Sequence, residues 1–465
     1  MIKKKVFLLI PSGVALRNFA FTDFYALAKS RNLNIVFWNG TPFELSNLGY
    51  EEVKLKNIKI HWFTDILKNV RKEVELNLNI ENNKDYVYNA YKFKRKNNSF
   101  KAFLKNSIIG VLAYFLKSNR GLSYLKNKIN TLEVSTDYYK HCLETLAQEK
   151  PDFVFCANQR IINAVAPLLA AKEMNIPTAA FIFSWDNLPK ATLVVDSDYY
   201  FVWSLFMKQE MEKYYPLINQ NNIISTGTPQ FESHFNENIL VSKQEFYKTY
   251  RLDFSKDYIC FSGDDITTSP DDPKYLRDLA NAITTLNNKG FSLGIILRKC
   301  PVDFSNRFDG VISEFDDLII EIAPKWSNVN NSWNTILPTK ADTILLSNTI
   351  KHSLFVVNIG SSMVFDYAAL NKPCCYFRYN QKTQENPSWD INKIYNYVHF
   401  RSMPDKAVVY FNSSSDIEAK IKGVLDDNSQ TVEKANLWFD VICQSPQNQS
   451  SNRIIEAIET IISER

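Results

Sequence analysis

Short apolar runs alternate with longer stretches that are apolar only at every third or fourth position in the first half of the chain. The short runs have the length and composition of buried strands, and the longer stretches have the periodicity of amphipathic helices. Such an alternation predicts a parallel sheet with helices on both faces. The predicted strands are Val6–Ile10, Leu33–Trp38, Ile58–Phe63, Asp152–Cys156, Thr178–Phe183, Tyr199–Trp203 and Ile223–Ser225, with helices over about residues 18–30 and 161–174.

A second alternating unit begins near residue 255, whereas residues 65–150 are mostly polar with a helical pattern. The sequence therefore predicts an α/β protein of two Rossmann-like doubly wound domains with a central cleft and a helical insertion in the first domain. We expect the first domain over residues 1–240, with the insertion at about 65–150, and the second over 241–428. Residues 429–465 are expected to form helices that cross back to the first domain. The second unit has predicted strands at Tyr258–Ser262, Ser292–Leu297, Leu318–Ile322, Leu354–Asn358 and Cys374–Phe377, and helices at about 273–287, 340–350, 363–370, 391–397 and 414–424.

The composition is that of a folded globular protein. The chain has 465 residues, of which 45% are hydrophobic and 22% charged, and its net charge of +4 is too small for a general nucleic-acid binder. Seven scattered cysteines form no CxxC pair, and we expect reduced thiols. The first apolar run ends at Pro11, which is too short for a secretory signal, and Ile108–Leu116 is far shorter than the roughly 20 residues that span a bilayer. We therefore expect a cytoplasmic protein.

Familiar cofactor motifs do not occur in the sequence. No GxGxxG follows the first predicted strand, and no GxxxxGK[ST] occurs, which disfavours a dinucleotide oxidoreductase and a P-loop NTPase. No Asp-x-Asp triplet stands in a suitable loop. We expect neither a cofactor nor a metal ion.

Small residues follow a strand of the second predicted domain, where a short helix begins. Glycine lets a ligand approach the backbone, and the N–H groups at a helix start suit a phosphate. Arg298 and Lys299 follow another strand and would neutralise phosphate charge. An ordinary serine-capped turn and solvated surface charge are the competing interpretations. The residues expected at this phosphate site are Gly263, Arg298, Lys299, Gly360, Ser361, Ser362 and Asp366.

Polar residues also follow the strands of the first predicted domain. Asp186 stands at the carboxyl end of a strand, where general bases are common, and Trp185 offers an aromatic surface for a sugar. Plain turns and helix caps are the competing interpretations, but the Ser-Trp-Asp-Asn cluster is unusual and favours function. The ligand-binding candidates are Gly13, Arg17, Asn18, Gln159, Arg160, Trp185 and Asn187, and the candidate bases are Asp186 and, in reserve, Asp23.

A basic segment, Lys92–Lys105, precedes the apolar run Ile108–Leu116. Basic residues next to an apolar helix are typical of contact with an anionic membrane surface. A solvated helix that leads into a core helix explains the same pattern equally well.

Several short motifs carry a resemblance to a known group of enzymes. Leu16–Phe19, Ser184–Leu188 and Thr226–Phe231 are similar to segments of polysaccharide-biosynthesis transferases. The second domain resembles bacterial sialyltransferases, Kdo transferases and CDP-glycerol glycerophosphotransferases, which carry a His-Pro motif and a Ser-Ser or Ser-Thr motif. Ser361-Ser362 matches the second motif, but Cys300-Pro301 stands where the histidine is expected. The chain thus resembles the GT-B-fold glycosyltransferases of bacterial surface-polysaccharide synthesis.

The resemblance implies a metal-independent, inverting glycosyltransferase. The second domain would bind a nucleotide-activated sugar, with a weak preference for a CMP-linked acidic sugar, and Arg298 or Lys299 would replace the missing histidine. The first domain would bind a surface-polysaccharide or lipid-linked acceptor. The alternatives are a polyol-phosphate transferase that uses a CDP-polyol, a nucleotide-sugar epimerase and a non-catalytic protein of a polysaccharide assembly complex.

Overall fold

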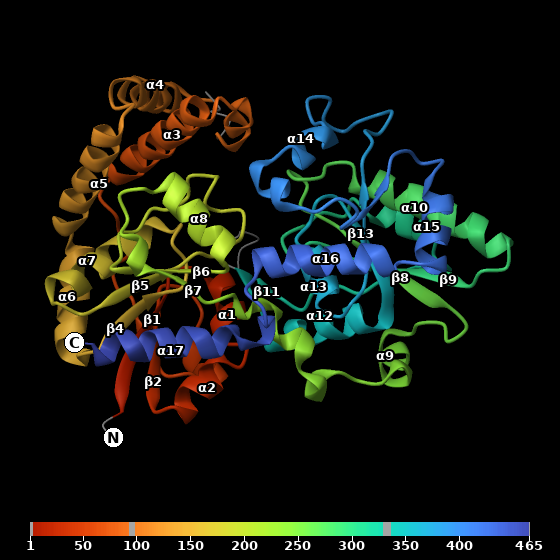
Figure 1. Ribbon diagram of the computed structural model, residues 1–465, viewed down its shortest axis with the longest axis horizontal. Helices are drawn as coiled ribbons and strands as arrows, with labels where there is room; N and C mark the ends of the chain where they lie inside the picture. Colours follow the sequence, from red (N-terminus) through yellow and green to blue (C-terminus); the bar gives the residue numbers. More distant parts are fainter. Residues whose placement is uncertain (1–2, 93–97, 329–335, 465) are drawn as a thin grey trace.

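Two parallel β-sheets with covering helices form two domains that lie side by side (Figure 1). The computed structural model describes residues 3–92, 98–328 and 336–464. The architecture confirms the predicted fold class of two doubly wound domains with a helical insertion in the first. Three cations of the predicted basic segment, Lys94, Arg95 and Lys96, lie outside the described residues.

The first sheet has seven parallel strands in the order β3-β2-β1-β4-β5-β6-β7. Strands in the middle of such a sheet are buried on both faces, which explains why they are continuous apolar runs in the sequence. Residues Val6–Ile10 of β1, for example, have no exposed surface. The strands are β1 Lys4–Ile10, β2 Leu33–Asn39, β3 Glu52–Lys54, β4 Phe153–Cys156, β5 Thr178–Phe181, β6 Tyr199–Val202 and β7 Ile223–Ser225.

The second sheet repeats the same winding with six parallel strands in the order β10-β9-β8-β13-β14-β15. In both sheets the strand order reverses direction once, between β1 and β4 and between β8 and β13. Ligands of doubly wound sheets bind beyond the carboxyl ends of the strands at such switch points. The strands are β8 Asp257–Ser262, β9 Leu293–Arg298, β10 Ile319–Glu321, β13 Ser353–Asn358, β14 Cys374–Phe377 and β15 Val409–Phe411, and a separate antiparallel pair joins β11 Ser327–Asn328 to β12 Ile336–Leu337.

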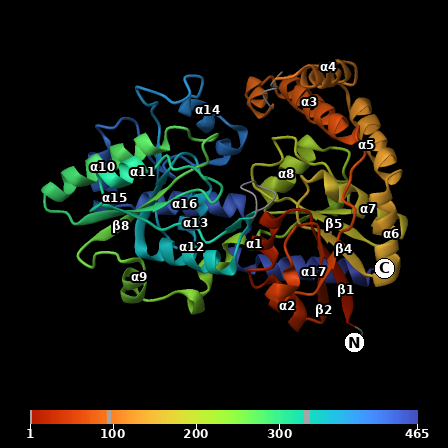
Figure 2. The same ribbon diagram turned by 180° about the vertical axis from the view of Figure 1, so that it is seen from behind.

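Among the described residues between β3 and β4, four α-helices form an outer wall of the first domain (Figures 1 and 2). Helix α3 packs against α4 and α5, and both α5 and α6 pack against α7. Serine or threonine side chains cap α4, α5 and α6 by accepting hydrogen bonds from backbone N–H groups, which fixes where each helix begins. The bounds are α3 Thr64–Asn83, α4 Phe100–Phe115, α5 Asn119–Val134, α6 Asp137–Glu149 and α7 Val165–Glu173.

The C-terminal helices connect the two domains. Helix α16 (Ser429–Ile442) packs against α13 (Met363–Ala368) of the second domain and α8 (Leu205–Tyr214) of the first. Helix α17 (Ser450–Ser463) lies along α2 (Phe24–Ser30) in both views of the ribbon (Figures 1 and 2). Arg31 at the end of α2 pairs with Glu459 of α17 at 2.6 Å. The C-terminal helices therefore pack against both domains.

The third predicted strand was wrong. Residues Ile58–Phe63 form no strand, and the edge of the first sheet is instead β3, which pairs with Phe37–Asn39. The backbone N–H of His61 donates to Glu133 of α5 at 3.1 Å, so this segment leads into the helical wall. An edge strand has one open side and needs no long apolar run, which is why the polar Glu52–Lys54 gave no signal.

The remaining helices cover the sheets, and none in the described part of the chain is long and apolar enough to cross a bilayer. The first predicted helix is broken between α1 and α2, where the hydroxyl of Thr22 donates to the carbonyl of Asn18 at 2.7 Å. The other helices are α1 Leu16–Phe19, α9 Lys243–Tyr250, α10 Asp272–Asn288, α11 Asp309–Glu314, α12 Lys340–His352, α14 Ile391–Tyr395 and α15 Ile417–Asp426.

Candidate functional site

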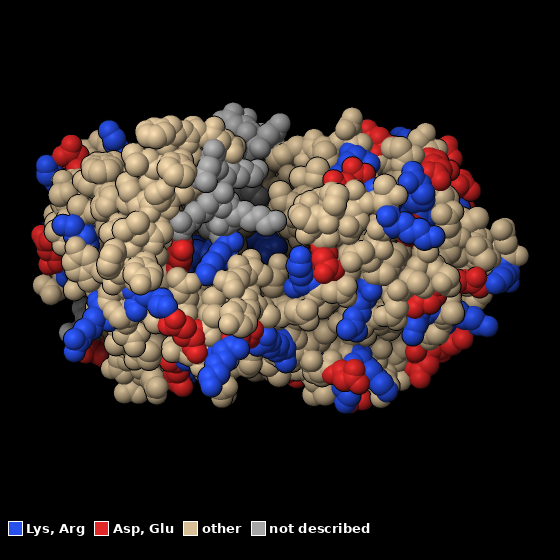
Figure 3. Space-filling model, turned by 90° about the horizontal axis from the view of Figure 1, so that it is seen from above, with Lys and Arg blue, Asp and Glu red and all other residues tan. Residues whose placement is uncertain are grey.

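A cavity of about 1840 Å³ lies between the two domains. The first domain contributes one face of α3, residues 184–186 and 190–194 after β5, and Arg160 after β4. The second domain contributes the loops after β8 and β13 and the segment from residue 385 to 400. Lysine and arginine side chains gather around the hollow in the view from above (Figure 3). The cavity thus lies where the switch points of both sheets predict a ligand.

The turn Gly360–Ser362 lines the cavity as the loop after β13. Gly360 has a φ of +62°, and a Cβ there would lie 2.8 Å from Ile394 Cγ2, so that only glycine fits. The N–H of Ser361 donates to Asn358 Oδ1 at 3.0 Å, which holds the turn. The hydroxyl of Ser362 makes no cap bond to α13. Because α13 has only six residues, backbone N–H groups of the turn matter more here than a helix dipole.

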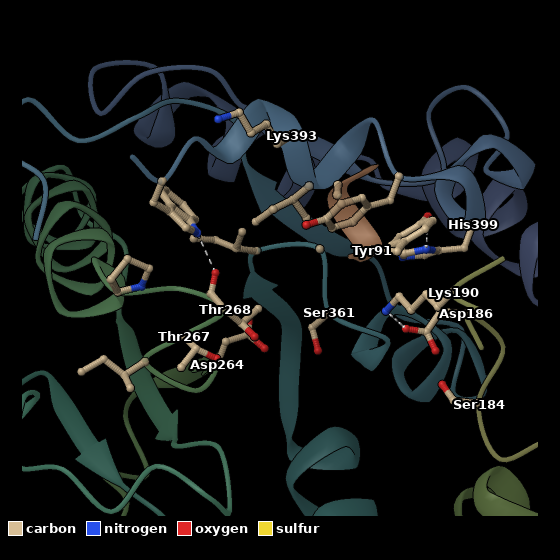
Figure 4. Close-up of a pocket in the computed structure, with 18 of the residues that line it drawn as sticks. Tyr91, Ser184, Asp186, Lys190, Asp264, Thr267, Thr268, Ser361, Lys393 and His399 are labelled. Atoms are coloured by element: carbon tan, nitrogen blue, oxygen red, sulfur yellow. Dashed lines mark hydrogen bonds and ion pairs between the residues drawn. The ribbon is translucent and has the colours of Figure 1, made fainter. Parts of the chain in front are cut away.

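Asp264 follows β8, next to this turn across the switch point, and points into the cavity (Figure 4). Its Oδ2 is buried and has no hydrogen-bond partner within the described ranges. Burial raises the pKa of Asp264 well above its ordinary value, and the nearby carboxylates Asp272 and Asp265 raise it further. A carboxyl group with a raised pKa in a cleft is a candidate acid or base.

Asp186 also lines the cavity, but it is already paired. One carboxylate oxygen accepts from Lys190 Nζ, and the other accepts from Asn187 Nδ2 at 2.9 Å (Figure 4). Burial alone would raise the pKa of Asp186, but the charge and hydrogen bond of Lys190, together with His399 and a hydrogen bond from Ser184, outweigh burial and hold the pKa below its ordinary value. Such a carboxylate is a weak proton acceptor, so this geometry disfavours Asp186 as the predicted base.

His399 and Tyr91 complete this corner of the cavity. Tyr91 Oη lies 3.5 Å from His399 Nδ1, and the ring of Trp185 contacts the histidine with centroids 4.8 Å apart. Burial lowers the pKa of His399 to about 3, so its imidazole is neutral at physiological pH. No local pattern in the sequence marked either residue.

Arg298 and Lys299 do not reach the cavity, contrary to the prediction. Arg298 Nη2 donates to both carboxylate oxygens of Asp342, at 3.0 and 2.9 Å, and only 6% of the arginine is exposed. Its Nη1 is buried and has no partner in the part of the chain that the structure describes. Lys299 pairs with Glu321 at 3.1 Å. Both side chains are neutralised by acids that stand many residues away in the sequence.

Gly263 is buried behind Asp264, against the ring of Phe308.

The loop after β1 turns toward the other domain instead of the cavity. A Cβ on Gly13 would lie 2.7 Å from the carbonyl oxygen of Ile336 in β12, so glycine permits a close contact between the domains. Arg17 Nη2 donates to Gln230 at 2.8 Å, and Asn18 is fully buried. None of the three lines the cavity. Their predicted role in ligand binding therefore finds no support in their position.

Two further predicted residues lie outside the cavity. Asp366 on α13 accepts from His234 Nε2 at 2.8 Å, and His234 Nδ1 lies 2.9 Å from Ser347 Oγ. These buried groups connect the end of the first domain to the second. Asp23, the reserve base, is an exposed residue at the start of α2 and is not among the cavity-lining residues.

Of the remaining first-domain candidates, two support the loop after β5 and two line the cavity. Gln159 is fully buried and donates to Asn187 Oδ1 at 2.9 Å, so these amides position the loop and do not themselves line the cavity. Arg160 does line it. Trp185 lines it too, but only 5% of the side chain is exposed, so the indole is packed among aromatic rings and is no open sugar platform.

The sequence prediction missed the charged face of α3. Lys68, Arg71, Lys72 and Glu75 stand at helix positions i, i+3, i+4 and i+7, which share one face, and all four line the cavity. The spacing was visible in the sequence. A polar helix face is usually solvated, and only the neighbouring domain turns this one into the wall of a cleft.

Comparisons with known proteins agree with the fold. No protein-family model and no curated protein matches the chain. UDP-GlcNAc 2-epimerase from Neisseria meningitidis bound to UDP-GlcNAc is similar with a TM-score of 0.50 and 11% identity, over 98% of this chain and 100% of that chain. A glycosyltransferase from Rickettsia africae is similar with a TM-score of 0.51 and 11% identity, over 100% of this chain and 99% of that chain. A variant of the wall teichoic acid polymerase TagF is similar with a TM-score of 0.50 and 13% identity, over 100% of this chain and 90% of that chain. At this identity the likeness shows a GT-B-like fold and not a particular family.

We predict that Arg298 stabilises the fold and does not hold a ligand. Arg298→Met should lower the free energy of unfolding by about 3–5 kcal/mol, because it leaves Asp342 buried without its counter-charge. Urea denaturation measures this. Arg277→Met is the matched control, since the pair of Arg277 with Glu314 is exposed and should contribute less than about 1 kcal/mol. An Arg298→Met variant that keeps its stability but loses nucleotide binding in calorimetry would return Arg298 to the phosphate site.

Proposed function

We propose that this protein is a metal-independent glycosyltransferase that moves a sugar from a nucleotide-activated donor to a surface-polysaccharide or glycolipid acceptor. The observation that carries the proposal is the arrangement of the cleft. At the switch point of one domain stand a glycine–serine turn and a carboxyl group that has no partner among the described residues, and several cations stand on the other domain across the cavity. Phosphate, sugar and acceptor hydroxyl need these kinds of groups together.

The second domain would bind the donor. The N–H of Ser361 is taken by Asn358, so the hydroxyls of Ser361 and Ser362 and the remaining backbone N–H groups of the turn would hold the phosphate. The UDP-GlcNAc bound to the epimerase of the same fold supports a nucleotide sugar as ligand. Charges on the first-domain side would stabilise the leaving phosphate without a metal ion. A CMP-linked acidic sugar remains our preferred donor, on the resemblance of the Ser361-Ser362 motif.

Asp264 is our candidate for the general base, in place of Asp186. The base would take the proton from the acceptor hydroxyl, whose oxygen would bond to the anomeric carbon as the bond from that carbon to the phosphate oxygen breaks. Attack from the face opposite the leaving nucleotide inverts the anomeric configuration. The raised pKa of Asp264 makes it the stronger proton acceptor of the two carboxylates.

The fold alone leaves two enzymatic alternatives. An epimerase of UDP-GlcNAc and a wall teichoic acid polymerase share it, so a nucleotide-sugar epimerase and a transferase of polyol phosphate are the rival functions. An epimerase would change the nucleotide sugar without any acceptor. A polyol-phosphate transferase would release CMP from a CDP-polyol and leave a phosphodiester in the product.

We predict that Asp264→Asn abolishes turnover and that Asp186→Asn does not. The removal of a general base typically costs about 10²–10⁴-fold in rate. The wild-type rate should rise with pH through the raised pKa of Asp264, because the carboxyl accepts a proton only once it is ionised. Mass spectrometry of reactions with CMP-, UDP- and GDP-sugars and CDP-glycerol, with and without a glycan acceptor, measures both donor and product.

The same reactions separate the proposals. Product from donor alone would identify an epimerase, and transfer only from CDP-glycerol would identify the polyol-phosphate reaction. Wild-type rates in Asp264→Asn together with loss in Asp186→Asn would restore Asp186 as the base. Absence of turnover and of any nucleotide-induced thermal shift would favour the non-catalytic protein.

We also propose that α4 contacts a membrane surface. Six apolar residues fall on one face of this helix, opposite Ile109 and Ala113, which pack toward α3. Phe100, Tyr114 and Phe115 are 81%, 77% and 76% exposed, and the top of the first domain has a broad uncharged surface (Figure 3). Residues 86–132 contain ten Lys and Arg and no Asp or Glu, which suits an anionic surface. The six exposed residues are Phe100, Phe103, Leu104, Val111, Tyr114 and Phe115.

We predict that replacing Phe100, Phe103 and Phe115 with serine reduces binding to vesicles of phosphatidylglycerol and phosphatidylcholine by at least about tenfold. Each buried aromatic side chain contributes about 1.5–3 kcal/mol. Co-sedimentation measures the bound fraction, and vesicles of phosphatidylcholine alone should bind less. The control is Phe254→Ser, which removes an exposed phenylalanine (58% exposed) from the second domain. This variant should bind the vesicles like wild type. Equal binding of the triple variant and wild type would contradict the membrane contact.

A further inference from the structure

The first-domain wall of the cleft carries an excess of positive charge. We call Lys68, Arg71, Lys72, Arg160 and Lys190 the basic wall, and all five line the cavity. Two carboxylates compensate part of this charge: Glu75 accepts from Arg71 at 2.8 Å, and Asp186 accepts from Lys190. Neither Lys68 nor Arg160 has an ion-pair partner in the described ranges, so cations outnumber acids on this side of the cleft.

The opposite wall has cations too, but acids neutralise them. Lys274 pairs with Asp271 at 2.9 Å and with Glu385 at 2.8 Å. Arg277 pairs with Glu314, and Arg307 pairs with Asp303 at 2.7 Å. Lys393 is the remaining cation of this wall. The excess of positive charge therefore belongs to the first domain, whereas the glycine–serine turn belongs to the second.

The cations of the basic wall also destabilise one another's charged forms. Burial lowers the pKa of Lys72 to about 8, and Arg160, Lys190 and Lys68 lower it further, against the opposing effect of Glu75. Burial lowers the pKa of Lys68, and Arg160 lowers it further, against the opposing effect of Asp65. A fold that keeps like charges together in a half-buried cleft needs a counter-charge, and a bound anion would supply it.

We infer that the basic wall is a binding site for a phosphate or diphosphate group, an inference that rests on the proposed transfer reaction in the same cleft. Arg160 offers a planar guanidinium for bidentate contact with phosphate oxygens, and the lysines add point charges. Two ligands bring this chemistry: the donor's own phosphates, reaching across the cleft, or a phosphate carried by the acceptor. The second fits a lipid-linked acceptor, because α3 carries Lys68 on one face and packs against the exposed α4 with another.

The test uses inorganic pyrophosphate as the probe. Isothermal titration calorimetry compares wild type with the double variant Lys68→Gln, Arg160→Gln at low ionic strength. Because charge-assisted hydrogen bonds are the stronger ones and each tenfold in affinity is about 1.4 kcal/mol, the dissociation constant should rise at least about tenfold. The control is Lys29→Gln with Lys128→Gln, two exposed first-domain lysines outside the cavity, which removes the same charge and should leave the constant within about twofold.

Every outcome decides the question. No pyrophosphate binding by wild type, or equal losses in the double variant and the control, overturns the site. A second titration in the presence of saturating UDP or CMP separates the sources: competition assigns the wall to the donor's phosphates, and undiminished binding assigns it to the acceptor's phosphate. If pyrophosphate binds through the wall but no nucleotide binds and no sugar is transferred, the proposed function fails while the phosphate site stands.

Discussion

The cleft depends on an aromatic cluster that holds the two domains together. Trp185 comes from the loop after β5, Phe365 from α13, Phe400 from the segment after α14, and Trp438 from α16. The centroid of the Trp185 ring lies 5.2 Å from that of Phe365 and 5.7 Å from those of Phe400 and Trp438. The ring centroids of Phe365 and Trp438 are 4.7 Å apart. Aromatic rings at these separations contribute more than their buried area alone. The cluster therefore fixes the position of the first-domain wall of the cleft relative to the second-domain wall.

The two walls of the cleft differ in the chemical groups that they present to a ligand. The second domain presents a backbone turn and a carboxyl group without a partner among the described residues, and the first presents cations in excess over acids. Asp186 lies between them, next to the cluster, and its pair with Lys190 is part of the first wall. In the proposed transfer, the turn of the second domain would hold the donor phosphate, and the cations of the first domain would neutralise phosphate charge from across the cleft.

The sequence predicted the buried parts of the fold well, because a parallel strand that is covered on both faces must be a continuous apolar run. The edge strand β3 was missed because it is short and polar. Among the site residues, Gly360–Ser362, Arg160 and Asp186 line the cavity, since they follow strands at or beside a switch point. Arg298 was misplaced because its partner Asp342 stands 44 residues away, and a pattern along the chain cannot reveal such a pair. Gly13 and Arg17 follow β1 as expected, but the other domain covers their loop.

In the proposed function, a nucleotide would bind between the turn Gly360–Ser362 and the carboxyl group of Asp264, with the first domain's cations across from it. The decisive experiment is a crystal structure with whichever of CMP, CDP, UDP and GDP gives the largest thermal shift. We expect a phosphate within hydrogen-bond distance of the serine hydroxyls or a backbone N–H group of this turn, with Asp264 facing the position of the sugar. A nucleotide bound outside this cleft, or one whose phosphates contact Arg298 and leave the turn empty, would contradict it.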